Sequence, residues 1–190
     1  MNEDTNCIDS IFEIFLILET DRFILRQVKD GDYSDIYDIY SEKEAVKYQQ
    51  TSPMTTIEQA KKSVEAFLRG FNEKRFIRWC ITEKEADKVL GLITLNNFNR
   101  NNSSAAIGYM LNKKYWRKNI MSEVGEKVIN YGFKTLNLHR IEASIHPDNI
   151  ASINVCLKLG FAKEELRKES VYNIATDGYE DRLIFGIVNN

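Results

Sequence analysis

A run of basic residues directly before a predicted helix is the first feature of this 190-residue chain whose side chains could do chemistry. Four cations lie within six positions, at Lys113, Lys114, Arg117 and Lys118. Residues 120–136, which follow, carry apolar side chains at helical spacing. The N-terminus of a helix has unpaired N–H groups and a dipole that favours an anion, so this turn suits a phosphate. The alternative is a solvated basic loop without a ligand.

The stretch after this helix predicts a strand, a turn and a second helix. Residues 140–146 alternate apolar and polar side chains, as a strand does. Pro147-Asp148-Asn149 has the chemistry of a turn, and residues 150–159 form a short helical pattern. Gly160 stands where the C-terminus of a helix favours positive φ. The expected order is therefore basic turn, long helix, strand, short helix.

The other elements complete an α/β fold with a mixed, mostly antiparallel central sheet of six or seven strands and helices on both faces. The strand before the basic turn and the strand at 140–146 form the expected parallel pair, and the long helix connects them. A capping box of Thr55 and Glu58 predicts a helix after Pro53. The apolar residues Ile11–Leu18 suggest an N-terminal helix that runs into the first strand. The strands are expected near residues 22–28, 76–82, 89–95, 105–111, 140–146, 162–172 and 179–188.

Composition limits the classes of function. A chain of this length, 43% apolar and 28% charged, fits one globular domain, which we expect at 18–190 after an extension at 1–17. The net charge of −2 argues against a nucleic-acid partner, and no apolar stretch is long enough for a membrane span. Three cysteines without metal or CxxC spacing favour a reduced, cytoplasmic compartment, and two histidines make a metal site improbable. A monomer and a homodimer are both compatible.

Three stretches of the sequence carry a resemblance to a known family. They are "LETDRFILRQVKDGDYSDIYDIY" from Leu18, "VLGLITLNNFNRNNSSAAIGYML" from Val89, and "HRIEASIHPDNIASINVCLKLGF" from His139, the most specific of the three. Together they resemble the GNAT superfamily of acetyl-CoA-dependent N-acetyltransferases, in particular the branch with the ribosomal-protein N-terminal acetyltransferases. The resemblance implies a GNAT-like fold and acetyl-CoA as the acetyl donor, without a metal.

The resemblance assigns the basic turn to the pyrophosphate of the cofactor. The family loop, Arg/Gln-x-x-Gly-x-Gly/Ala, falls on Trp116, Arg117, Lys118, Asn119, Ile120 and Met121. Both glycines common in this branch are absent, since Arg117 and Asn119 stand in their places. Asn is the non-glycine residue that best tolerates left-handed backbone, so Asn119 is expected to hold the turn.

Two further segments are assigned to the cofactor by the same resemblance. The strand at Tyr109, Met110 and Leu111 is expected to offer backbone N–H groups to the thioester and the pantetheine arm. The preceding Gly108 fits a bulge, a close ligand approach or a packing demand. At the start of the short helix, Asn149, Ser152 and Asn154 are expected to contact the cofactor, although Asn149 could simply cap the helix.

Proton handling departs from the family pattern. Many relatives have Tyr where this chain has Cys156, and Glu where it has Ala106. We therefore expect Ser152 to serve the departing thiolate and Glu169 to act as a base, directly or through water. An α-amine is roughly a sixth neutral at pH 7, whereas a lysine amine is neutral to about one part in a few thousand. A weak base therefore favours a protein N-terminus as the acceptor. The alternatives are a polyamine or antibiotic acceptor, or a CoA-binding protein without turnover.

Overall fold

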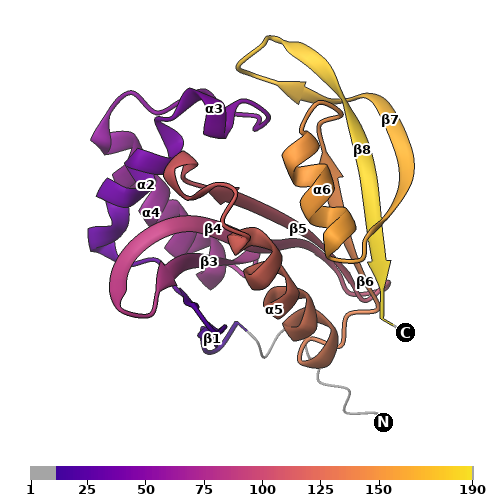
Figure 1. The fold of residues 1–190 in the computed structure, drawn as a ribbon, viewed down its shortest axis with the longest axis horizontal. Helices are drawn as coiled ribbons and strands as arrows, with labels where there is room; N and C mark the ends of the chain where they lie inside the picture. The colour runs from indigo at the N-terminus through magenta and orange to yellow at the C-terminus, as the bar shows by residue number, and fades with distance from the viewer. Residues whose placement is uncertain (1–11, 190) are drawn as a thin grey trace.

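The computed structural model describes residues 12–189, which form eight strands, five α-helices and two short 3-10 helices (Figure 1). The strands are β1 (Leu18–Glu19), β2 (Phe23–Arg26), β3 (Phe76–Glu83), β4 (Ala86–Asn99), β5 (Ser104–Leu111), β6 (Arg140–Ile145), β7 (Ala162–Asn173) and β8 (Gly178–Val188). The helices are η1 (Asp30–Asp32), α2 (Tyr33–Tyr40), α3 (Lys43–Val46), α4 (Ile57–Asn72), η2 (Lys113–Tyr115), α5 (Ile120–Lys134) and α6 (Ile150–Lys158). None of the helices in this range is long and apolar enough to cross a membrane.

All strands belong to one sheet, in the order β1-β2-β3-β4-β5-β6-β8-β7. Only β5 and β6 pair in parallel within the described residues, and α5 connects them. The other neighbours pair antiparallel. The expected mixed, mostly antiparallel sheet and its parallel pair are thus confirmed. The sheet has eight strands because the two residues of β1 add a short edge strand beside β2.

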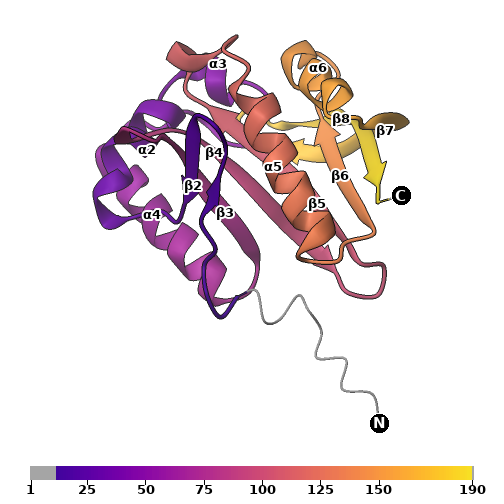
Figure 2. The same cartoon turned by 60° about the horizontal axis from the view of Figure 1, so that its bottom comes forward.

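Alternating side chains on the central strands build a core on each face of the sheet. Trp79 and Ile93 lie in the core under α5, while Cys80 and Leu92, one residue away on the same strands, pack with residues of α2 and α4. This is the period-2 pattern of a strand buried on both faces. Figure 2 shows α2 and α4 gathered together, apart from α5 and α6. The expectation of helices on both faces is therefore confirmed.

The parallel pair separates partway along its length. β5 and β6 pair only from Ser104↔Arg140 to Ala106↔Glu142. Beyond this point β5 continues to Leu111 beside β4, while β6 continues beside β8. We call this opening the β5–β6 split. It leaves one edge of β5 without a partner strand, which frees backbone N–H and C=O groups for a ligand.

The expected N-terminal helix at Ile11–Leu18 is wrong for the residues that the structure describes. Residues 12–17 form a turn followed by irregular chain, and Ile11 lies outside the described residues. The physical reason lies in tertiary contacts of this short segment. Trp79 donates from Nε1 to the carbonyl oxygen of Leu16 at 2.9 Å, and the rings of Phe12 and Phe15 pack on Phe71.

The capping box of α4 lies one residue later than the sequence suggested. Thr56 is the N-cap, and its partner is Gln59 instead of the expected pair Thr55 and Glu58. Gln59 Oε1 accepts hydrogen bonds from the N–H groups of Thr55 at 2.7 Å and Thr56 at 3.0 Å. One amide oxygen thereby satisfies two backbone donors, which favours this register.

Candidate active site

The loop before α5 has left-handed backbone at both positions where the family resemblance led us to expect glycine. Arg117 has φ 61° and Asn119 has φ 59°. Asn119 is the N-cap of α5, yet its side chain does not cap the helix; its Oδ1 accepts a hydrogen bond from Lys158 Nζ at 2.6 Å. The N–H groups of the first turn of α5 therefore lack a side-chain cap within the described residues. An anion can take that place.

Neighbouring side chains hold this loop in position. Trp116 Nε1 donates to the carbonyl oxygen of Leu111 at 2.8 Å. Arg22, at the start of β2, donates to the carbonyl oxygen of Lys118 at 3.2 Å and pairs with Glu123 at 2.7 Å. Lys113, one of the four cations of the basic turn, points elsewhere and pairs with Glu44 at 2.9 Å. Arg117 and Lys118 are cations of the loop itself, Lys158 contacts the loop from α6, and Arg22 tethers it.

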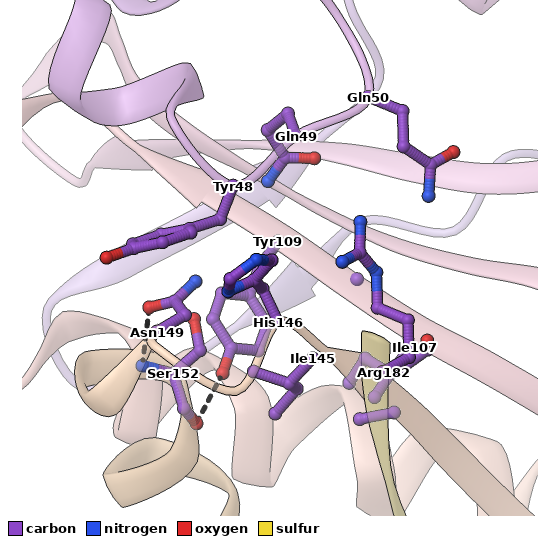
Figure 3. Close-up of a pocket in the computed structure, with 13 residues that line it drawn as sticks. Tyr48, Gln49, Gln50, Ile107, Tyr109, Ile145, His146, Asn149, Ser152 and Arg182 are labelled. Atoms are coloured by element: carbon purple, nitrogen blue, oxygen red, sulfur yellow. Dashed lines mark hydrogen bonds between the residues drawn. The ribbon is translucent and has the colours of Figure 1, made fainter. Parts of the chain in front are cut away.

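A pocket of about 130 Å³ opens in the β5–β6 split (Figure 3). That volume is well below the roughly 300–1,000 Å³ of a drug-sized site, so it suits the reacting ends of two substrates and no whole cofactor. β5 and β6 form its walls, and the start of α6, the chain after α3 and β8 complete it. The lining residues are Tyr48, Gln49, Gln50, Ile107, Gly108, Tyr109, Ala143, Ser144, Ile145, His146, Asn149, Ser152 and Arg182.

Gly108 leaves the wall of this pocket open. A Cβ atom built at Gly108 would meet no heavy atom within 4 Å, so packing does not require glycine here. The residue pairs with Thr94 in regular register, which also removes the expected alternative of a bulge. Close approach of a ligand to the β5 backbone is the remaining explanation among those that the sequence offered.

The start of α6 brings Asn149 and Ser152 together at the pocket. Asn149 Oδ1 accepts a hydrogen bond from the Ser152 N–H at 3.1 Å, so Asn149 does cap the helix. Both residues also line the pocket, as Figure 3 shows, so the cap and a ligand contact are compatible. Asn154 is exposed on α6 and is not part of the lining.

Tyr109 and Cys156 meet at the base of the pocket, a contact that the sequence did not reveal. The Tyr109 hydroxyl donates to the carbonyl oxygen of Ser152 at 3.2 Å and lies 3.8 Å from Cys156 Sγ. Burial raises the pKa of Tyr109 and raises the pKa of the Cys156 thiol to about 11. Near neutral pH the phenol therefore stays protonated, and Cys156 is a poor nucleophile.

His146 presents a hydrogen-bond donor to the same pocket. Its Nδ1 accepts from the backbone N–H of Asp148 at 3.1 Å, which assigns the proton of the neutral ring to Nε2. The ring packs against Tyr48, with 5.0 Å between centroids. Because Nδ1 is already engaged, His146 is suited to donate a hydrogen bond and poorly suited to act as a base.

Glu169 does not come together with Ser152. It is an exposed residue in the irregular part of β7, with φ 46°, and its N–H donates to Asp181 Oδ1 at 2.8 Å. It does not line the pocket. The residues that the sequence reasoning missed are Tyr48, His146 and Arg182. Only Arg182 could have been identified from the sequence, because it is a cation followed directly by the apolar strand residues 183–185.

Comparison with known proteins supports the same reading of the fold. The family model described as acetyltransferase (GNAT) domain matches residues 22–162. The Bacillus subtilis (strain 168) protein named uncharacterized N-acetyltransferase YoaA is 39% identical over 163 residues, 86% of this chain and 92% of that protein. Uncharacterized N-acetyltransferase p20 of Bacillus licheniformis is 36% identical, over 80% of this chain and 85% of its own. A GNAT-family acetyltransferase from Bacillus anthracis shares the fold, with a TM-score of 0.81 at 22% identity, covering 91% and 98% of the two chains.

More distant relatives have names that state a substrate. The ribosomal protein uS5-alanine N-acetyltransferase of Escherichia coli (strain K12) is 26% identical, over 80% of this chain and 81% of its own. Spermidine N(1)-acetyltransferase of the same organism is 23% identical, over 78% of each. GNAT acetyltransferases use acetyl-CoA. With a family model that matches most of its length and two relatives above 30% identity, the chain belongs to the GNAT family and is an acetyl-CoA-dependent N-acetyltransferase.

Proposed function

We propose that this enzyme acetylates the α-amine of a protein N-terminus, and that the amine attacks directly in a ternary complex with acetyl-CoA. The observation that carries the proposal is the pocket in the β5–β6 split, where an unpaired strand edge meets a wall of neutral donors and one arginine. Direct attack is supported by the high pKa of Cys156, because a neutral buried thiol is a poor carrier of an acetyl group.

The residues present fit the cofactor, since the α5 N-terminus lacks a side-chain cap and Gly108 leaves open space beside β5. In this proposal the loop Trp116–Met121 holds the pyrophosphate. The backbone of Tyr109, Met110 and Leu111, with Asn149 and Ser152, holds the pantetheine arm. Acetyl-CoA, when bound, supplies an acetyl thioester. Asn154 is a weaker candidate because it lies outside the pocket.

The proton steps then rest on hydroxyl groups and on the acceptor itself. We expect Ser152, which lines the pocket, to donate toward the sulfur that leaves. The Tyr109 hydroxyl contacts the backbone carbonyl oxygen of the same residue. The described lining contains no carboxylate that could act as a base. A terminal α-amine needs little help, since roughly a sixth of it is neutral at pH 7. Glu169 would need a different conformation of β7, or a chain of water molecules, to take part.

The lining also bears on the choice between acceptors. A polyamine carries several positive charges, and its binding would be favoured by carboxylates. The described lining residues include no carboxylate. The relatives include acetyltransferases named for a ribosomal protein and for spermidine. The absence of carboxylates from the described lining favours the first of these classes, and a small-molecule acceptor is the runner-up.

We further propose that residues 18–190 form the single catalytic domain, with residues 1–17 as an extension. The contact of Leu16 with Trp79 supports packing of the end of that extension on the domain. A cytoplasmic setting is supported by the free, buried thiols of Cys80 and Cys156. The proposed enzyme is a monomer or a homodimer.

A ligand-induced thermal shift tests the proposed cofactor site. Acetyl-CoA and CoA at 100 times their dissociation constants should each stabilise the protein by about 2.7 kcal/mol, and ATP should not. Turnover of an N-terminal peptide by the same preparation completes the test. A shift without turnover of any amine would point to the CoA-binding protein without activity. No shift at all would remove the loop as the cofactor site.

A further inference from the structure

Arg182 is the one permanently charged side chain in the described lining of the split pocket. It is buried, with 3% of its surface exposed, and it rises from β8 toward Gln50 across the pocket (Figure 3). Burying a cation is costly unless it is paired and hydrogen-bonded. A guanidinium kept at this position therefore calls for an explanation beyond packing.

The guanidinium is neutralised but retains hydrogen-bond donors. Arg182 Nη2 pairs with Glu180 Oε2 at 2.9 Å, and Nη1 donates to the carbonyl oxygen of Asp181 at 2.9 Å. These are two hydrogen bonds from a group that has five N–H donors. The pair as a whole has no net charge, yet Arg182 lines the pocket, as Figure 3 shows.

A second contact fixes Glu180 and ties the opposite wall of the pocket to it. The fully buried Asn173 donates from Nδ2 to Glu180 Oε1 at 2.7 Å and to the carbonyl oxygen of Gln49 at 3.4 Å. Burial by itself would raise the pKa of Glu180, but the hydrogen bonds from Asn173 and Arg182 hold that pKa below its ordinary value. Glu180 therefore stays ionised near neutral pH and keeps Arg182 in one orientation.

We propose that Arg182 is a specificity-determining residue that binds the carbonyl oxygen next to the acceptor α-amine. This inference rests on the proposed function and deepens it. A guanidinium donates well to an oxygen acceptor, and a neutral carbonyl adds no charge to the neutralised pair. A free carboxylate would bring a second anion beside Glu180, and an alkylamine or polyamine offers no oxygen. The pocket thus selects a peptide N-terminus over a free amino acid, a simple amine or spermidine.

The test compares four acceptors at saturating acetyl-CoA: alanyl-alaninamide, free alanine, isopropylamine and spermidine. Rates are expressed per concentration of neutral amine, which removes differences in amine pKa. The wild-type kcat/KM should be about 10- to 100-fold higher for the dipeptide amide than for the other three, the value of one hydrogen bond to a charged group. Equal values for all four would overturn the proposal.

Two variants assign that preference to Arg182. Arg182→Lys keeps the charge beside Glu180 but loses the planar fork, and should lower kcat/KM about tenfold or more for the dipeptide amide alone. The double variant Arg182→Met with Glu180→Gln removes the pair without leaving a buried charge and should behave in the same way. Arg167→Lys is the matched control, since Arg167 pairs with Glu165 on exposed β7 outside the pocket. Equal losses on the dipeptide amide and isopropylamine would mean that Arg182 acts only through structure.

A binding measurement separates failure of this inference from failure of the proposed function. Calorimetric titration of alanyl-alaninamide into each protein in the presence of CoA should show affinity weakened by Arg182→Lys and unchanged by Arg167→Lys. If no acceptor turns over, the proposed function fails, and the titration still decides the role of Arg182. If all acceptors turn over and the titration shows no effect of Arg182→Lys, only the role of Arg182 fails.

Discussion

Hydroxyl and imidazole groups, and no carboxylate, supply the proton chemistry available among the described lining residues. Ser152 at the start of α6 and Tyr109 of β5 both line the pocket, and the Tyr109 hydroxyl donates to the Ser152 carbonyl oxygen. His146 Nδ1 accepts a hydrogen bond from the Asp148 N–H. General acid catalysis contributes typically 100- to 10,000-fold, so the loss of the acting hydroxyl should be visible in kcat.

The pair Ser152→Ala and Glu169→Gln separates the two catalytic roles expected from the sequence. Ser152→Ala should lower kcat by about tenfold or more, because it removes a donor at the pocket. Glu169→Gln should keep kcat within about twofold of wild type, because the residue is exposed on β7 outside the lining. Steady-state kinetics at saturating substrates measure both. A tenfold loss in Glu169→Gln would restore Glu169 as the base.

The loop that precedes α5 keeps its left-handed geometry without glycine. Arg117 and Asn119 have φ near 60° at the two positions where the family resemblance led us to expect glycine. Left-handed backbone costs an ordinary residue roughly 1–2 kcal/mol, and Asn is the better tolerated of the two. In the proposed function, the Arg117 cation would stabilise an anion at the helix N-terminus, and this would offset the cost of the strained backbone.

Arg117→Gly should therefore raise the free energy of unfolding by about 1 kcal/mol through relief of this strain. The same variant should weaken acetyl-CoA binding, since it removes a cation beside the proposed pyrophosphate site. Urea unfolding and a thermal shift titration measure the two effects. Arg117→Ala is the control, because it removes the charge and keeps the strain. A Gly variant no more stable than the Ala variant would show that the backbone at this position is not strained.

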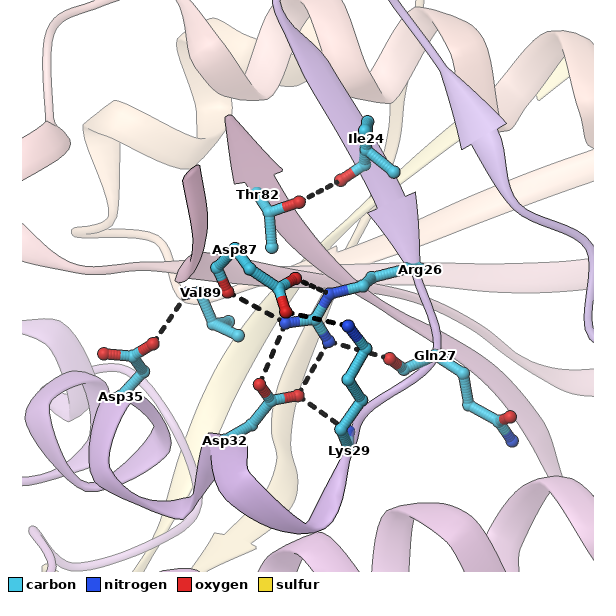
Figure 4. A network of polar contacts seen from close by, with 9 residues as sticks. All are labelled: Ile24, Arg26, Gln27, Lys29, Asp32, Asp35, Thr82, Asp87 and Val89. Atoms are coloured by element: carbon cyan, nitrogen blue, oxygen red, sulfur yellow. Dashed lines mark hydrogen bonds and ion pairs between the residues drawn. The ribbon is translucent and has the colours of Figure 1, made fainter. Parts of the chain in front are cut away.

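At the scale of the whole molecule, a buried ion-pair network connects the sheet to the segment that leads through α2 and α3 to the pocket. Arg26 of β2 makes two hydrogen bonds to Asp32, at 2.8 and 2.9 Å, and one to Asp87 of β4 at 2.6 Å (Figure 4). The side chains of Arg26 and Asp32 are only 7% and 8% exposed. Asp32 directly precedes α2, whose chain continues through α3 to the pocket wall at Tyr48.

Asp32→Ala should lower the free energy of unfolding by about 3–5 kcal/mol, because it leaves the Arg26 charge buried with less compensation. Asp87→Ala should cost about 1 kcal/mol or less, because the Asp87 side chain is 63% exposed. Urea unfolding with a common slope measures both. Equal losses of unfolding free energy in the two variants would show that solvent already stabilises the charge of Arg26.

Much of the fold and of the loop followed from local sequence. The sequence correctly predicted the alternating strands and the two helices after the basic turn. It also correctly predicted the positive φ of Gly160 and Asn119. These features depend on backbone preferences and on side chains a few residues apart, which a single sequence displays. The family resemblance added the identity of the chemistry.

The acceptor side of the pocket was decided by tertiary structure alone. Sheet order places β8 beside β6, and this brings Arg182 opposite Tyr48 and Gln49, more than a hundred residues earlier in the chain. The contact of Tyr109 with Cys156 spans 47 positions in the same way. Glu169 lies outside the pocket lining on β7, the edge strand that β8 separates from β6. Such contacts arise from long-range strand pairing and packing, for which no periodicity in the sequence provides a signal.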